Sequence, residues 1–152
     1  MNASDRKLAV QSELYKHPGC GPRATVSERM RRVRKVGTAP EMAVRSELTG
    51  LGHRYRINVK DLPGSPDIAN RSKGYAILVH GCFWHRHREC HRTTTPKANQ
   101  GFWRAKFESN KKRDQRVIGQ LVRMGIRVLV VWECETQSQA QLRTKLRRFF
   151  GT

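Results

Sequence analysis

Residues 80–91 read HGCFWHRHRECH and hold four histidines, two cysteines and two large aromatic residues. Cysteine and histidine are the ligands that bind zinc in proteins, and histidine also transfers protons near neutral pH. A strand core does not need such side chains. The stretch therefore predicts a metal centre, an active site, or an interleaved pair of the two.

A third cysteine suited to metal binding, Cys134, directly follows an apolar run far along the chain. A structural zinc site takes four thiolate or imidazole ligands in a tetrahedron. Three come from Cys82, Cys90 and Cys134, and a histidine must supply the fourth, from among His80, His85, His87 and His91. We expect zinc to staple the Cys/His insertion to the sheet, because a short polar insertion cannot bury a core of its own. The alternative is three ordinary buried cysteines; Cys20, which stands alone, is expected to be a free thiol.

Asp67, in the sequence GSPDIA, adds the chemistry of a hard cation. If residues 66–70 and 75–80 pair as a hairpin, Asp67 lies close to His80 and His85. A carboxylate there can hold Mg²⁺, which neutralises charge on a phosphodiester, and a histidine can activate water. Glu41 either supplies another oxygen or only stabilises the positive end of its helix.

The charge balance of the chain points to a polyanionic partner. Its 152 residues include 31 Lys and Arg against 12 Asp and Glu, a net charge of +19. Such an excess opposes folding by self-repulsion and is typical of nucleic-acid-binding proteins. Residues 29–35 are the densest basic segment and include Arg31 and Arg32, which we expect to contact phosphates.

The remaining candidates are apolar. Phe83 and Trp84 stand in the polar insertion and Trp103 begins a long basic helix, so they either stack on nucleic-acid bases or cover the core. Met30 is either a core anchor or an apolar side chain directed at the partner.

The elements that position these residues follow from periodicity. Thr38 can cap a helix over residues 39–52, and residues 53–58 alternate as a strand. Residues 66–70 and 75–80 form a hairpin, a charged helix covers residues 99–124, a second buried strand covers 126–132, and a basic helix covers 137–150. The fold class is α/β: a small mixed central sheet flanked by helices, with the zinc-stapled insertion. Residues 1–26 are expected to be a flexible basic arm and residues 27–152 a single domain.

The opening residues, MNASDRKLAVQSELY, have no apolar core of the kind a signal peptide needs, and no run of the sequence approaches the length of a membrane span. Clustered cysteines and histidines in a reduced compartment indicate metal rather than disulfides. We therefore expect a cytoplasmic protein.

Several segments together resemble the very short patch repair endonucleases, the Vsr family. These are SERMRRVRKVGTAPEMAVRSELTGLGHRYRI, DLPGSPDI, VHGCFWHRHREC, FWRAKFESNKKRDQR and GIRVLVVWEC, which span about residues 27–136 in order. HGCFWH followed by a later VVWEC is the most specific part of the match.

The resemblance implies a monomeric bacterial enzyme at the nucleoid that nicks double-stranded DNA 5′ of the mispaired thymine in T:G mismatches left by deamination of 5-methylcytosine. It implies a fold like that of restriction endonucleases, a structural zinc and a catalytic Mg²⁺. Asp67 and the Val79 carbonyl would hold Mg²⁺, His85 would be the catalytic histidine, and His80 and Glu41 would support it. The implied zinc ligands are Cys82, His87, Cys90 and Cys134, and the implied DNA contacts come from Phe83, Trp84, Trp103 and Met30.

Two alternatives stay open from the sequence. One is a restriction-type endonuclease of the same fold that cuts other modified or unmismatched DNA. The other is a zinc-stapled DNA-binding module without catalysis, although binding alone does not need a carboxylate beside phosphate.

Overall fold

The computed structural model describes residues 36–151. The predicted arm of residues 1–26, Cys20, Met30, Arg31 and Arg32 lie outside the described residues, so the expectations about them stay predictions. The elements run in the order α2 (Ala39–Gly50), β1 (Arg56–Ile57), β2 (Ile68–Asn70), β3 (Tyr75–His80), α3 (Cys82–His85), α4 (Gln100–Arg123), β4 (Arg127–Trp132), the 3-10 helix η1 (Glu133–Gln137) and α5 (Gln139–Phe150).

The strands form one mixed four-stranded sheet in the order β1-β2-β3-β4. The predicted hairpin is confirmed, because β2 and β3 pair antiparallel with Ile68 opposite Ile77. β4 pairs parallel with β3 along its whole length, which aligns His80 with Trp132. The long helix α4 makes the crossover that a parallel pair requires. The ends of β3 and β4 thus lie side by side, and α3 and η1 continue from them.

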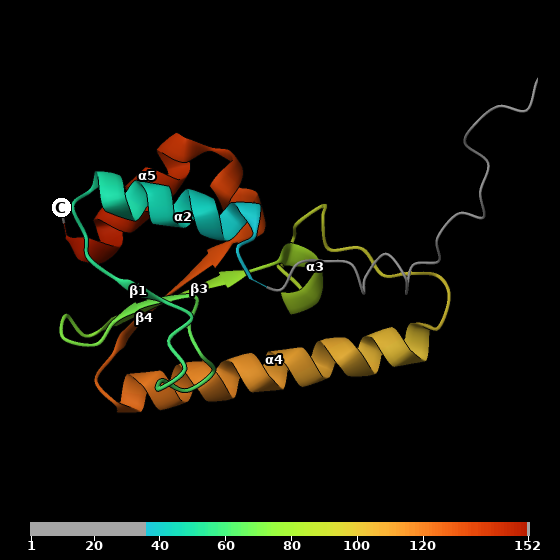
Figure 1. Ribbon diagram of the computed structural model, residues 1–152. Helices are drawn as coiled ribbons and strands as arrows, with labels where there is room; N and C mark the ends of the chain where they lie inside the picture. The colour runs from blue at the N-terminus through green and yellow to red at the C-terminus, as the bar shows by residue number, and fades with distance from the viewer. Residues whose placement is uncertain (1–35, 152) are drawn as a thin grey trace, which may run out of the picture. The chain divides into compact units, whose positions relative to one another are not determined.

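Helices cover both faces of the sheet (Figure 1). On one face, α2 and α5 pack against the strands through Val44, Leu48, Leu142 and Leu146, which are all buried. On the other face, the sheet packs against the end of α4 through Leu121 and the following Ile126. This is the α/β arrangement with a mixed central sheet that the sequence predicts; the likeness to restriction endonucleases stays a prediction.

The strands at the sheet's edges differ from expectation. The strand predicted over residues 53–58 is reduced to Arg56 and Ile57, because the chain pairs with β2 only there. The sequence predicts a buried strand over residues 126–132, but within β4 only Val131 is buried and Arg127 is exposed. β4 is an edge strand, which leaves its side chains half-covered. Among the described residues, no helix is long and apolar enough to cross a membrane.

Candidate active site and metal centre

Asp67 lies immediately before β2, beside the end of β3. Its Oδ2 accepts a 2.7 Å hydrogen bond from the Val79 backbone N–H. Burial raises the pKa of the Asp67 carboxyl, and the nearby negative charge of Glu41 adds to the increase, while the Val79 hydrogen bond opposes it. The hairpin thus places Asp67 in contact with Val79, the residue before His80, at the end of the strand where the sequence predicts it.

Glu41 lies in the first turn of α2 and is buried, with 7% of its surface exposed. Its carboxylate accepts hydrogen bonds from the Gly37 backbone N–H and the Thr38 hydroxyl, both at 2.9 Å. Thr38 Oγ1 in turn accepts from the Glu41 backbone N–H at 3.4 Å, so the N-cap residue and Glu41 bind each other. Glu41 thus lies in the first turn, where an acid stabilises the positive end of the helix, and its charge also reaches Asp67.

His80, His85 and Asp114 form a compact group, which we call the histidine–carboxylate cluster. Their ligand atoms lie within 4.8 Å of one another, close enough to hold a metal ion. The two imidazole rings stack with centroids 3.9 Å apart. His85 Nδ1 and Asp114 Oδ2 are 2.5 Å apart, a short hydrogen bond between α3 and α4.

The charges within this cluster are coupled. Burial, together with the neighbouring His85 charge, lowers the pKa of His80 to about 4, so His80 is neutral at pH 7. Burial alone would raise the pKa of Asp114, but the hydrogen bond to His85 and the charge of His85 hold it below its usual value. The cluster is therefore a neutral histidine beside a histidine–carboxylate pair.

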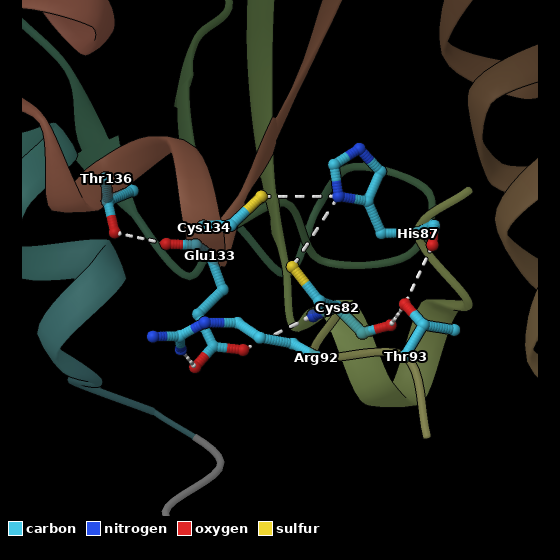
Figure 2. A network of polar contacts seen from close by, with 7 residues as sticks. All are labelled: Cys82, His87, Arg92, Thr93, Glu133, Cys134 and Thr136. Atoms are coloured by element: carbon cyan, nitrogen blue, oxygen red, sulfur yellow. Dashed lines mark hydrogen bonds and ion pairs between the residues drawn. The ribbon is translucent and has the colours of Figure 1, made fainter. Parts of the chain in front are cut away.

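A second group, the thiol cluster, consists of Cys82, His87, Cys90 and Cys134, whose ligand atoms also lie within 4.8 Å of one another. Figure 2 shows the sulfur atoms of Cys82 and Cys134 both directed at His87 Nδ1, at 3.7 and 3.3 Å. Ligands about 2.0–2.3 Å from a tetrahedral zinc lie about 3.3–3.8 Å from one another, and both distances fall in this range, so the spacing suits zinc. All three thiols are free of disulfides.

Spacing alone does not choose among the four histidines for the fourth ligand position. His80 and His85 belong to the other cluster, and His91 is exposed, so His87 is the histidine that the fold brings to the thiols. The His87 ring is also stacked on Trp132, with centroids 4.3 Å apart. Burial raises the pKa of the Cys82 thiol to about 12, so a bound cation is what would make this thiol a thiolate.

The segment after Cys90 folds back over α3. Arg92 Nη1 donates to Glu133 Oε1 at 2.9 Å, and Glu133 Oε2 accepts from the Cys82 backbone N–H at 3.3 Å (Figure 2). The Thr93 hydroxyl lies within hydrogen-bond distance of the carbonyls of Cys82 and His87. The start of α3 is therefore tied both to η1 and to the segment that follows Cys90.

The predicted DNA-contacting aromatics gather where α3 meets the first turns of α4. Phe83 packs edge-on against Trp84, Trp103 and Phe107, at centroid distances of 5.1, 5.5 and 5.3 Å. Trp103 is buried, with 5% of its surface exposed, whereas Phe83 and Trp84 are only partly covered. The structure thus brings the three aromatics together, and their contact with DNA stays a prediction.

Known proteins share long stretches of this sequence. A family model described as DNA mismatch endonuclease Vsr matches residues 22–92. The chain is 46% identical over 118 residues to type II nicking enzyme V.XorIIP of Xanthomonas oryzae, covering 78% of this chain and 86% of the relative. It is 39% identical over 120 residues to the DNA mismatch endonuclease Vsr of Escherichia coli, covering 79% of this chain and 76% of the relative.

The chain belongs to the Vsr family. It is accordingly a DNA endonuclease, and the alternative of a binding module without catalysis is set aside. As a Vsr enzyme it needs a site for phosphodiester hydrolysis, and among the described residues the histidine–carboxylate cluster beside Asp67 has the chemistry for one.

The sequence analysis missed Asp114 and Asn110. Both lie on α4, and Asn110 is buried and donates from Nδ2 to the Trp84 carbonyl at 3.0 Å. A signal was present, because Trp103, Phe107, Asn110 and Asp114 recur at helical spacing on one face of α4. Two polar residues on an apolar stripe indicate polar partners across the contact.

Proposed function

We propose that this Vsr enzyme is a Mg²⁺-dependent nicking endonuclease for T:G mismatches. It would cut 5′ of the mispaired thymine that deamination of 5-methylcytosine leaves, and so begin very short patch repair. The observation that carries the proposal is the His85–Asp114 pair stacked on His80 and set beside Asp67. The similarity to a DNA mismatch endonuclease and to a nicking enzyme supports a mismatched substrate and a single-strand cut.

Asp67 and the Val79 carbonyl are the groups proposed to hold Mg²⁺. In an extended strand the N–H and C=O of one residue face the same neighbour, so the Val79 carbonyl faces the side from which its N–H reaches Asp67. Two oxygen donors beside a second carboxylate, Glu41, fit the ligands that Mg²⁺ prefers. The ion would neutralise charge on the scissile phosphate.

His85 is the residue proposed to accept the proton of the attacking water. Its Nδ1 is engaged by Asp114, which fixes the ring and stabilises its charged form, and leaves Nε2 to take a proton. His80 stays neutral and packs flat against His85, so it holds the ring in place without adding a competing charge.

The thiol cluster is the proposed zinc site. Three thiols and one imidazole are a donor set typical of structural zinc, with all four positions taken by protein. Cys82 begins α3 and Cys134 lies in η1, so a zinc ion here would join the insertion to the end of the sheet. That arrangement supports a structural rather than a catalytic metal.

The partner is proposed to be double-stranded DNA carrying the mismatch, bound by a monomer in the bacterial cytoplasm. The net charge of +19 suits the phosphate backbone. Phe83 and Trp84, which are partly exposed, are the aromatics proposed to wedge beside the mismatch, and the buried Trp103 packs against both of them. Met30, Arg31 and Arg32 are proposed contacts from the part of the chain that the structure does not describe.

The deciding experiment compares nicking of three matched duplexes that differ at one pair: T:G, C:G and 5-methylcytosine:G, each with Mg²⁺ and with Mg²⁺ chelated. The proposal predicts a cut in the thymine strand of the T:G duplex alone, and only with Mg²⁺. Equal cutting of the C:G or methylated duplex would favour the restriction-type alternative.

A further inference from the structure

η1 follows β4 directly and carries two carboxylates that reach in different directions. Glu135 accepts from the Trp132 backbone N–H at 2.8 Å and pairs with Lys145 of α5 at 2.6 Å. Glu133 pairs instead with Arg92 at 2.9 Å and accepts from the Cys82 backbone N–H. One acid therefore anchors η1 to α5, and the other anchors it to the start of α3.

The start of α3 matters because α3 has only four residues, Cys82–His85. Phe83, Trp84 and His85 all project from this single turn, so a change in its direction moves all three. The link that Glu133 makes lies at Cys82 N, the first residue of the turn, while the link to Asp114 lies at His85, the last. The turn is thus held at both ends.

Gly81 leaves little room at this junction. A Cβ built on Gly81 would lie 3.3 Å from Trp84 Cδ1 and 3.9 Å from Glu133 Oε2. The Glu133 carboxylate therefore packs close to the chain where β3 passes into α3. Arg92 closes over its other oxygen, and both side chains are about one-third exposed, at 31% and 35%.

We infer that Arg92 and Glu133 are positioning residues for the nuclease site, which set the direction of α3 and so the place of His85. The inference rests on the proposed function of His85 and extends it to a pair that holds the start of α3. The pair acts on the rate of the cleavage step through His85, and a tilt of α3 that also moves Phe83 and Trp84 weakens DNA affinity as well. A displacement of about 1 Å in a reacting group costs on the order of 100-fold in rate, so a modest tilt of α3 is enough.

The Glu135–Lys145 pair is a matched control on the same short helix. Its side chains are 30% and 28% exposed, close to those of Glu133 and Arg92, and the pair contacts α5 rather than α3. R92M and K145M each remove one positive charge, and E133Q and E135Q each remove one negative charge. Each variant is therefore compared with a control of the same net charge. Partly exposed pairs of this kind contribute on the order of 1 kcal/mol to stability, so all four variants are expected to fold.

The experiment measures single-turnover nicking of the T:G duplex at saturating protein, together with Kd for uncut duplex, zinc content and Tm. R92M and E133Q are expected to lose about tenfold or more in the cleavage rate, by the same displacement argument. Their zinc content and Tm should match those of K145M and E135Q. A weaker Kd follows from the shift of Phe83 and Trp84 but does not account for the loss of rate, because the protein saturates the duplex. The double variant R92M/E133Q should lose no more than either single variant, and R92K should recover part of the rate because it keeps the charge.

Cleavage rates of R92M and E133Q equal to those of K145M and E135Q would overturn the inference. So would a loss of zinc that accounts for the whole loss of rate. If E133Q does not fold, R92M and R92K carry the comparison, because they leave the chain around Cys134 intact. If the wild-type protein nicks no duplex, the proposed function itself fails; if it nicks and the Arg92 variants match their controls, only the positioning role fails.

Discussion

Asp114 on α4 and His85 on α3 share a 2.5 Å hydrogen bond across 29 positions of sequence. Both side chains are largely buried, with 15% and 17% of their surface exposed. A carboxylate in this position selects the tautomer of the ring and stabilises its protonated form.

Replacing Asp114 with Asn should therefore slow nicking without unfolding the protein. An amide keeps the size of the side chain but can favour the wrong tautomer of His85, and losses up to about 10⁴-fold follow from such a change. Single-turnover nicking of the T:G duplex measures the effect. D61N is the matched control, because Asp61 is exposed and pairs only with Arg71; a D114N rate equal to that of D61N would contradict the assignment.

Zinc analysis tests the thiol cluster. Folded wild-type protein should hold about one zinc per chain, and C90S should lose the metal, the order of the insertion and the nicking activity together. C20S is the control, since Cys20 is expected to be a free thiol. Folded, active C90S without zinc would show that the cluster is only a group of reduced cysteines.

The buried Glu47 links α2 to α5 and should make the stability of the protein depend on pH in the acid range. Its carboxylate accepts from Arg143 Nε at 2.8 Å and from the Gln139 amide. The Arg143 hydrogen bond, with that from Gln139, lowers the pKa of Glu47 below its ordinary value. Its stabilising effect is therefore complete above the unfolded-state pKa and is lost as the pH falls through the lower folded-state pKa.

E47Q should consequently reduce the free energy of unfolding by about 1–3 kcal/mol at pH 7. Denaturant unfolding across pH should show the gap to wild type shrinking in acid. E108Q is the control, because Glu108 makes only an exposed pair with Lys111. A gap that is the same at every pH would contradict the ionised role of Glu47.

Gly64, in the loop just before Asp67, packs closely against α4. It has a positive φ of 72°, and an added Cβ would lie 2.5 Å from Val117 Cγ1 on α4. G64A should destabilise the protein by about 1–3 kcal/mol, and V117A should relieve the steric part of that loss in the double variant. G50A is the control, since Gly50 is helical with no neighbour within 4 Å of an added Cβ; it should be neutral or slightly stabilising in thermal unfolding. Equal melting temperatures for G64A and G50A would refute the close approach.

Prediction from the sequence succeeded where local pattern determines structure. The apolar run of residues 75–80 and the stretch at 99–124 each identify their element, and the hairpin then brings Asp67 beside β3. What local pattern cannot give is which face of α4 meets α3. Asp114 stands among Lys and Arg in the sequence, and only the crossing of the two helices brings it to His85.

The zinc ligand illustrates the same limit. His87 and His91 are both near Cys90 in sequence, and spacing alone left the choice open. The left-handed residue Arg86, with φ 55°, ends α3 and turns His87 back toward Cys82, while His91 remains exposed. The Arg92–Glu133 pair joins residues 41 positions apart and has no local signature at all.

The most direct test of the account is the nicking of a T:G duplex by D67A with saturating Mg²⁺. The Asp67 carboxylate is hydrogen-bonded to Val79, the strand residue before His80, and it is proposed to hold the ion. The account predicts that D67A binds the duplex as wild type does and leaves the thymine strand uncut. A D67A protein that nicks the duplex at the wild-type rate would contradict it.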